Sequence, residues 1–367
     1  MINFAFFPSR RLALYMVRLF IIRSLAVLFA LILVLMTLDL LGEAGKILAV
    51  PGNGDAELWH YIVLRVPILV SRFLPFSVLL GTLIAFVSLN QNSEVVAMKA
   101  AGLSAHQILA PLVIASIGIA AVLFAFNETV VVNSARHVDA WSNNDYKPIP
   151  PASGVLSNVW LLQDDDLVRA AIVTGRGTGM TLHRVSIYDR SGGVLQRVIN
   201  AATATPDRSG GGWLLHKVEL YDANMNVVRH AFQVKALAGI TPAQFTIAKV
   251  DPTELDYWTL KQRIVELEAA GRSTDEARAG LAHKLSGPLS TLLMPLLAAV
   301  AAFGLARSGH VMVRAVLGMA LGFAYFVADN FSLAMGNAGA YPPLVAAWAP
   351  FFLFLLIGEA VLVRTEE

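Results

Sequence analysis

The chain has 367 residues, of which 56% are hydrophobic and only 15% are charged. Because soluble domains carry about 25% charged residues, this composition excludes an ordinary soluble protein and indicates a membrane protein. The 28 basic and 26 acidic residues nearly cancel, and the sequence lacks the basic stripe typical of nucleic-acid binders. Cysteine is absent, which excludes disulfides, thiolate metal sites and cysteine nucleophiles.

Six apolar windows are long enough to cross the membrane as helices, since about 20 residues span ~30 Å of hydrocarbon. The windows are residues 24–41, 66–89, 108–126, 285–306, 313–331 and 345–363. A polar stretch separates the third window from the fourth. The chain is therefore predicted to divide into a membrane half at 1–126, an insert at 127–283 and a second membrane half at 284–367.

The basic residues beside the windows predict the orientation, because cytoplasmic loops are enriched in Lys and Arg. With the N-terminus inside, only Lys46 and Arg65 flank the outer loops. The cytoplasmic side then carries Arg10, Arg11, Arg18, Arg23, Lys99, Arg307, Arg314 and Arg364. We therefore expect cytoplasmic termini and an external insert.

The N-terminal region has two features of its own. Its apolar run continues to Leu41 without a small-x-small site before Glu43, so a retained helix is favoured over a cleaved signal peptide. Residues 10–23 alternate basic and apolar side chains, which predicts an amphipathic helix at the inner membrane surface.

The insert changes from helical to alternating periodicity near Val155 and has regularly spaced turn signals. Short strands are predicted at 159–162, 167–173, 182–189, 194–201, 213–221 and 227–235. This pattern indicates an antiparallel sandwich or a jelly-roll-like β-domain. The run Asp164-Asp165-Asp166 has two interpretations, a cation site or a polar turn between strands, and the turn is favoured.

Two capping boxes follow Pro252, at residues 259–262 and 273–276. In each, a hydroxyl and a Glu or Gln side chain are spaced to satisfy free amides at a helix start. They predict short helices at 260–270 and 274–283 that lead into the fourth window. Such a joint would transmit movement between the insert and the membrane, although a plain connector fits the same pattern.

The cytoplasmic segment 90–104 predicts a short helix over about 93–101. Asn92 or Ser93 would cap it, Glu94 would lie in its first turn, and Gly102 would end it. Its apolar and charged side chains are candidates for docking a partner, against the alternative of a plain surface turn. The candidates are Glu94, Val95, Val96, Met98, Lys99 and Gly102.

Charged residues in or beside membrane windows are costly and mark candidate functional positions. Asp39, Arg65, Arg72 and Asp329 would line a cavity for a charged headgroup. The alternatives are that the acids reach interfacial water, that Arg65 extends to the surface, and that Arg72 pairs with an acid.

The fifth window contains Gly318 and Gly322 at GxxxG spacing, which allows close helix approach either inside one bundle or at a subunit interface. Enzyme motifs are missing from the sequence. No Lys precedes Ser or Thr, so there is no Walker A loop, and HExxH, GxSxG and GxGxxG are absent.

Three helices, an external β-domain and three further helices resemble the LptF/LptG permease family of lipopolysaccharide export. The motifs that carry this resemblance are Leu74-Pro-Phe, Leu80-Gly81, residues 93–102, 304–307 and 318–322, Asp329-Asn330 and Tyr341-Pro-Pro343. The last third is more similar to LptG than to LptF.

This resemblance implies an inner-membrane subunit that pairs with an LptF-like sister and docks an LptB-like ATPase dimer through the helix at Glu94. ATP and Mg²⁺ would bind that partner, and no cofactor is expected in this chain. Gly318 and Gly322 would lie at a lateral gate against the sister. Lipopolysaccharide or a related glycolipid would pass to LptC/LptA-like β-domains toward the outer membrane.

One departure from the family concerns the outer half of the first helix, where members can carry lysines suited to lipid A phosphates. Here residues 36–46 contain acids and the single Lys46. Arg65, Arg72 and Arg136 are candidates for the missing positive charge.

Two other function classes remain open from the residues alone. A membrane-anchored envelope sensor or assembly factor would use the β-domain to bind a ligand, but it has little need for six helices. An intramembrane enzyme would need a motif around Asp39 or Asp329, and the sequence shows none.

Overall fold

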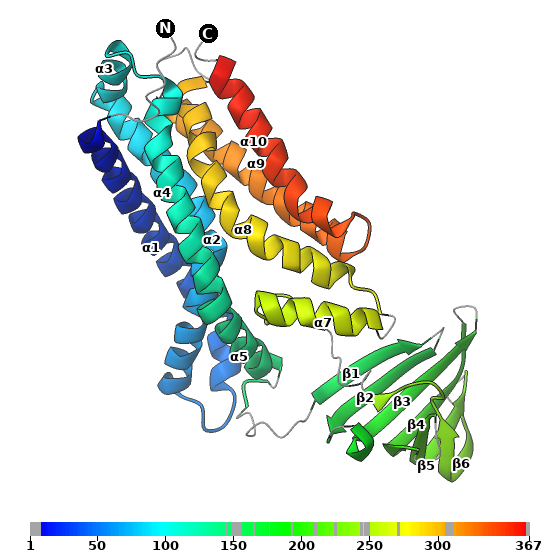
Figure 1. Cartoon of the computed structure of the whole chain (residues 1–367). Helices are drawn as coiled ribbons and strands as arrows, with labels where there is room; N and C mark the ends of the chain where they lie inside the picture. Colours follow the sequence, from blue (N-terminus) through cyan, green and yellow to red (C-terminus); the bar gives the residue numbers. More distant parts are fainter. Residues whose placement is uncertain are drawn as a thin grey trace. The chain divides into compact units, whose positions relative to one another are not determined.

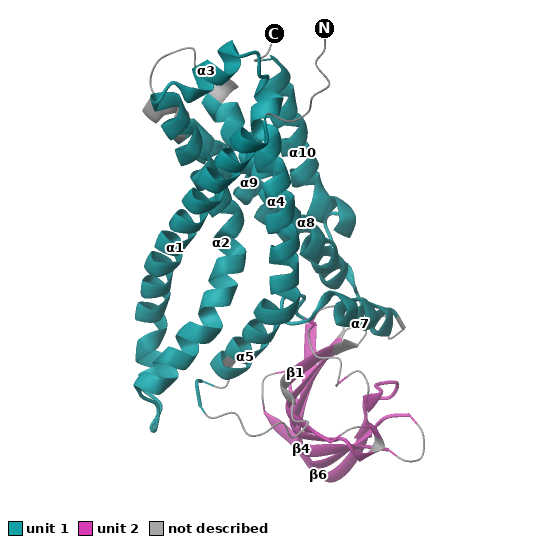
Figure 2. Ribbon diagram, turned by 60° about the vertical axis from the view of Figure 1, so that its left-hand side comes forward, with its two compact units in different colours: residues 1–147, 251–367 teal, residues 148–250 magenta. Residues whose placement is uncertain are grey.

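The computed structural model describes residues 9–143, 145–147, 156–163, 166–175, 177–191, 194–207, 211–223, 226–242, 245, 250–269, 272–304 and 311–364. The chain forms two compact units, Met1–Lys147 with Asp251–Glu367, and Pro148–Val250 (Figure 2). The second unit is narrower than the predicted insert, because helical segments on both sides of it belong to the first unit.

The first unit is a helical bundle, and six of its described helices are long and apolar enough to cross a membrane. They are α1 (Arg10–Leu48), α2 (Asp55–Gln91), α4 (Ala105–Phe126), α8 (Asp275–Ala299), α9 (Val311–Asn337) and α10 (Pro343–Arg364). The start of α1, the short helix α3 (Glu94–Ala100) and the end of α10 lie at one end of the bundle (Figure 1). Helices α5 (Val132–Asn143) and α7 (Tyr257–Ala269) lie at the other end. The six predicted spans are confirmed.

Helix α1 is one continuous helix of 39 residues. The predicted amphipathic segment 10–23 is helical but is not a separate element, because no Pro or Gly interrupts residues 10–41. At about 1.5 Å per residue, α1 is much longer than the hydrocarbon layer, so it extends beyond the membrane. It packs along α2, and a Cβ added to Gly81 would lie 2.5 Å from Cα of Ser24.

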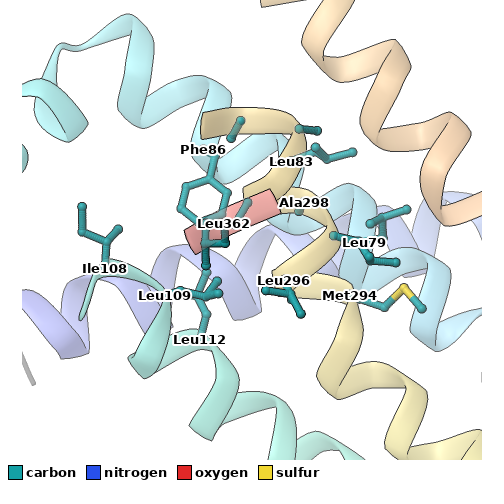
Figure 3. Close-up of a cluster of buried hydrophobic side chains, with 14 of the residues drawn as sticks. Leu79, Leu83, Phe86, Ile108, Leu109, Leu112, Met294, Leu296, Ala298 and Leu362 are labelled. Carbon is teal, nitrogen blue, oxygen red and sulfur yellow. The ribbon is translucent and has the colours of Figure 1, made fainter. Parts of the chain in front are cut away.

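Helix α8 is the most buried of the six and packs against α2, α4, α9 and α10. Figure 3 shows apolar side chains of α2, α4 and α10 beside those of α8, among them Leu79 and Phe86 of α2, Leu112 of α4, Leu296 of α8 and Leu362 of α10. Every labelled side chain in this cluster is less than a tenth exposed. The cluster holds the two membrane halves of the chain together as one bundle.

The second unit contains one antiparallel sheet, and each of its six described strands pairs with its neighbour in the chain. The strands are β1 (Leu156–Gln163), β2 (Asp166–Thr174), β3 (Thr181–Ser191), β4 (Val194–Pro206), β5 (Trp213–Asp222) and β6 (Val227–Ala236). The sheet is curved (Figure 2), and one face carries a core around Trp213, Leu215 and Phe245. The predicted antiparallel β-domain and all six strands are confirmed.

The acidic run between the first two strands lies partly outside the described residues, because only Asp166 is described. Asp166 begins β2, and its carboxylate accepts the backbone N–H of Arg190 at 3.0 Å. Among the described residues no group of three or more His, Cys, Asp or Glu is arranged to hold a metal ion.

The helices after the β-domain differ from the prediction at their starts. Helix α7 begins at Tyr257, because Asp256 accepts both the backbone N–H and the hydroxyl of Thr259, at 3.0 and 2.6 Å. The capping box proposed at Thr259 is therefore wrong, and the cap is the preceding acid. The predicted helix 274–283 is the first part of α8, which runs without a break from Asp275 into the membrane.

Candidate functional site

Helix α3 is the candidate docking element, at the end of the bundle where α1 begins and α10 ends (Figure 1). Ser93 occupies the N-cap position in the left-handed conformation, and Gly102, with φ of +86°, follows the helix. Val95 and Met98 are buried, at 3% and 8% exposure, and belong to the same apolar cluster as Met16 and Phe20 of α1. These two residues hold the helix to its own chain, and their direct contact with a partner stays a prediction.

The surface of α3 available to a partner is the opposite face. Val96 is 63% exposed, and Ala97 and Lys99 are exposed beside it. Glu94 is half-buried, and one of its carboxylate oxygens accepts the hydroxyl of Tyr15 of α1 at 3.3 Å. Glu94 therefore lies at the border between the packed face and the open face.

Two of the candidate charges, Asp39 and Arg65, form a closed network between α1 and α2. The guanidinium of Arg65 donates two hydrogen bonds to the two carboxylate oxygens of Asp39, at 2.9 and 3.0 Å. Tyr61 donates its hydroxyl to the same carboxylate at 2.6 Å. Because the charges neutralise each other in bidentate geometry, Asp39 and Arg65 lock α1 to α2 and leave little charge for a ligand.

Lys46 is also engaged within the chain. Its ammonium pairs with Glu43 at 2.8 Å, and the other Glu43 oxygen accepts the hydroxyl of Tyr146 at 2.7 Å. Asn53 adds hydrogen bonds to the carbonyls of Ile47 and Tyr146, both at 3.0 Å. Burial raises the pKa of the Tyr146 hydroxyl, which therefore stays protonated and able to donate at neutral pH. This network ties the α1–α2 tip to the end of α5.

The remaining cavity candidates fall into two groups. Arg136 is exposed and donates to the carbonyl of Glu254 at 2.9 Å, and Asp329 is 3.9 Å from His283 with 16% of its side chain exposed. Arg72 is exposed on α2, and it forms no ion pair with any residue in the described part of the chain. Of the six candidates, Arg72 is the one that forms neither an ion pair nor a side-chain hydrogen bond with the described residues.

The GxxxG face of α9 is filled from inside the chain. A Cβ on Gly322 would lie 1.9 Å from Cδ2 of Leu79, and one on Gly318 would lie 2.6 Å from Cδ2 of Leu83. Both leucines belong to α2, so these two glycines pack within the bundle. Their place at a lateral gate against a sister subunit stays a prediction.

Comparison with known proteins identifies the family. Residues 14–364 match the family described as lipopolysaccharide export system permease LptF/LptG. The chain belongs to the LptF/LptG family. It is therefore a multi-pass permease of lipopolysaccharide export, and not itself an ATPase.

The curated relatives are LptG proteins of similar length. The chain is 27% identical over 355 residues to the lipopolysaccharide export system permease protein LptG of Escherichia coli strain K12, covering 94% of each chain. It is 23% identical over 323 residues to the LptG protein of Haemophilus influenzae, covering 86% of this chain and 89% of that one. The match extends over both membrane halves and the β-domain of this LptF/LptG chain.

Sequence reasoning missed one prominent contact in this LptF/LptG permease. Glu128, just after α4, pairs with Lys284 of α8 at 2.8 Å, and both side chains are largely buried. A signal was present, since an acid directly follows the third span and a lysine directly precedes the fourth. Consecutive spans place such residues at the same side of the membrane, although their rotation decides whether they meet.

Proposed function

We propose that this chain is the LptG-type subunit of an export transporter in a bacterial inner membrane, with cytoplasmic termini and a periplasmic β-domain. The observation that carries the proposal is the family match along 14–364, together with relatives that are named LptG. The transporter takes lipopolysaccharide or a related glycolipid from the outer leaflet and passes it to a β-domain bridge. LptC/LptA-like proteins would form that bridge.

An LptB-like ATPase dimer and an LptF-like sister subunit are the partners that this function requires. The exposed face of α3, formed by Glu94, Val96, Ala97 and Lys99, supports ATPase docking because its other face is anchored in the bundle. Because α3 is packed against the bundle on one side, it can transmit a conformational change of the ATPase to α1 and α2. ATP and Mg²⁺ bind the partner in this scheme.

Arg72 is the proposed contact for the glycolipid headgroup. Counted from Gln91, where α2 ends beside α3, Arg72 lies about 28 Å along the helix at about 1.5 Å per residue. That is close to the outer edge of a hydrocarbon layer ~30 Å thick, where phosphate groups of the outer leaflet lie. An exposed guanidinium at this depth suits a phosphate, since it offers paired donors and keeps its charge.

The experiment that tests the proposal is a mild-detergent purification of the tagged chain from its native membrane, with mass spectrometry of the proteins that accompany it. We expect an ATPase and a second six-helix permease of similar size. Recovery with signalling proteins, or alone under conditions that preserve other complexes, would favour the sensor class instead.

A charge reversal on α3 makes the same purification a test of the proposed docking surface. Glu94→Lys is expected to remove the ATPase while retaining the sister permease. The matched control is Asp55→Lys, which reverses an exposed acid in the first turn of α2 at the opposite end of the bundle and leaves both partners bound. Equal loss of the ATPase in both variants would contradict docking at α3.

A further inference from the structure

The third membrane helix changes its geometry where it leaves the apolar window. Between α4 and α5, residues Asn127–Val131 form a π-helix. This wider helical turn is rare in proteins, and where it occurs it is often at a functional site. The side-chain oxygen of Asn127 is buried and accepts no hydrogen bond from the described part of the chain. Both features mark this turn as a locally unfavourable arrangement that its surroundings must stabilise.

Glu128 supplies that stabilisation by joining three elements. One carboxylate oxygen accepts the ammonium of Lys284 on α8 at 2.8 Å, and the other accepts the backbone N–H of Tyr257, the first residue of α7. The Glu128 and Lys284 side chains are only 14% and 12% exposed. A single side chain therefore connects the third span, the fourth span and the helix that follows the β-domain in sequence.

The chemistry of each contact favours a carboxylate at this position. The first amides of a helix lack partners within the helix and carry partial positive charge, so an acid beside the start of α7 is stabilised. Removing one partner of a buried ion pair leaves an uncompensated charge, which is strongly unfavourable. Arg136 of α5 reinforces the same joint by binding the carbonyl of Glu254, just before α7.

We propose that Glu128 and Lys284 are positioning residues for transport, which hold α7 on the third and fourth spans so that movement of the bundle reaches the β-domain. The two chain segments that lead into and out of the β-domain are α5 and the segment before α7, and Glu128 lies next to both. This inference rests on the proposed function, because it assumes that the bundle moves while glycolipid is delivered.

The test uses the assembled transporter in lipid nanodiscs with ATP, and measures ATP hydrolysis and the glycolipid delivered per ATP. The variants are Glu128→Gln, which keeps an acceptor for the α7 amide but loses the ion pair, and Lys284→Met. The matched control is Glu268→Gln, which breaks the exposed pair between α7 and α8 formed by Glu268 and Arg278. Because the chain lacks cysteine, spin labels at Val122→Cys on α4 and Val265→Cys on α7 report the distance between these helices.

We expect Glu128→Gln and Lys284→Met to broaden the α4–α7 distance distribution and to reduce delivery per ATP at least about fivefold, with ATP hydrolysis retained. The Glu268→Gln control keeps both properties. An unchanged distance distribution, or unchanged delivery despite a broadened one, would overturn the positioning role. If the proposed function itself were wrong, the unmodified complex would deliver no glycolipid, which distinguishes that outcome from loss of the positioning role alone.

Discussion

The charged residues in or beside the membrane windows of this permease differ in whether they have a partner within the chain. Charge in or beside an apolar window singles out Asp39, Arg65 and Arg72 in the sequence, whereas their partners follow only from the fold. Asp39 binds Arg65 and Tyr61, whereas Arg72, less than two turns further along α2, faces outward. Whether two spans bring opposite charges together depends on the rotation of each helix about its axis, which packing decides.

The headgroup contact assigned to Arg72 makes a residue-level prediction. Arg72→Glu is expected to reduce photocrosslinking of glycolipid at this position by more than tenfold, because a carboxylate repels phosphate, whereas Arg72→Lys retains part of it. Crosslinking is measured with a probe at the adjacent Phe73 in the assembled transporter. Lys261→Glu is the control, since it reverses an exposed charge on α7 that has no assigned role, and equal loss in both variants would refute a specific contact.

Glu254 gives a prediction about pH. Burial, followed by repulsion from Asp251 and Asp139, raises the pKa of its carboxyl, although Arg136 opposes part of this shift. A raised pKa means that the protonated form is favoured in the fold, so its contribution to stability is present at low pH and is lost as pH rises through the folded pKa. Glu254→Gln, which keeps a donor for Asp139, should therefore raise the melting temperature at pH 7 and change it little near pH 4. A melting temperature that Glu254→Gln raises near pH 4 but leaves unchanged at pH 7 would contradict a raised pKa for Glu254.

At the scale of elements, regular periodicity predicted the spans and strands well, while element starts and contact faces were less accessible. Helix α7 begins two residues before Thr259 because Asp256 is the stronger cap, and both residues fit the sequence pattern for an N-cap. In α3, a helix of seven residues, Val95 and Met98 are buried on one face, whereas Val96 is exposed on the other. Only the bundle beneath the helix shows which of them is covered.

The two faces of α3 predict opposite phenotypes. Val96→Asp is expected to weaken ATPase binding without changing the stability of the isolated chain, because Val96 is exposed. Met98→Ala is expected to destabilise the chain by about 2 kcal/mol or more, as for other buried methionines. Thermal unfolding and ATPase titration of the two variants separate these effects, and a destabilised Val96→Asp chain would contradict the orientation of α3.

The contact between α9 and α2 can be tested through its glycines. Gly322→Val is expected to destabilise the isolated chain by about 1–3 kcal/mol, because the new side chain overlaps the fully buried Leu79. Leu79→Ala should restore part of this loss by opening space. Gly118→Val on α4 is the control, because beyond the neighbouring backbone of its own helix nothing lies within 4 Å of an added Cβ there. If Gly322→Val impaired only pairing with a sister subunit, the glycine would belong to an interface instead.

At the scale of the whole molecule, the order of three spans, an antiparallel insert and three further spans was predictable, because hydropathy and alternating periodicity are properties of long segments. The boundary of the insert was not predictable, because the sequences of α5 and α7 are polar enough to be assigned to a soluble domain. Contacts of α5 with α2 and of α7 with α8, and the hydrogen bond from the backbone of Tyr257 to Glu128, assign both helices to the bundle.

The most direct test of the account is delivery of glycolipid by the reconstituted transporter. Proteoliposomes containing this chain, the ATPase, the sister permease and labelled lipopolysaccharide are incubated with a soluble β-bridge protein as acceptor. We expect ATP-dependent transfer to the acceptor that is lost when this chain is omitted or carries Glu94→Lys. Hydrolysis of ATP without transfer by the complete complex, or transfer that persists without this chain, would contradict it.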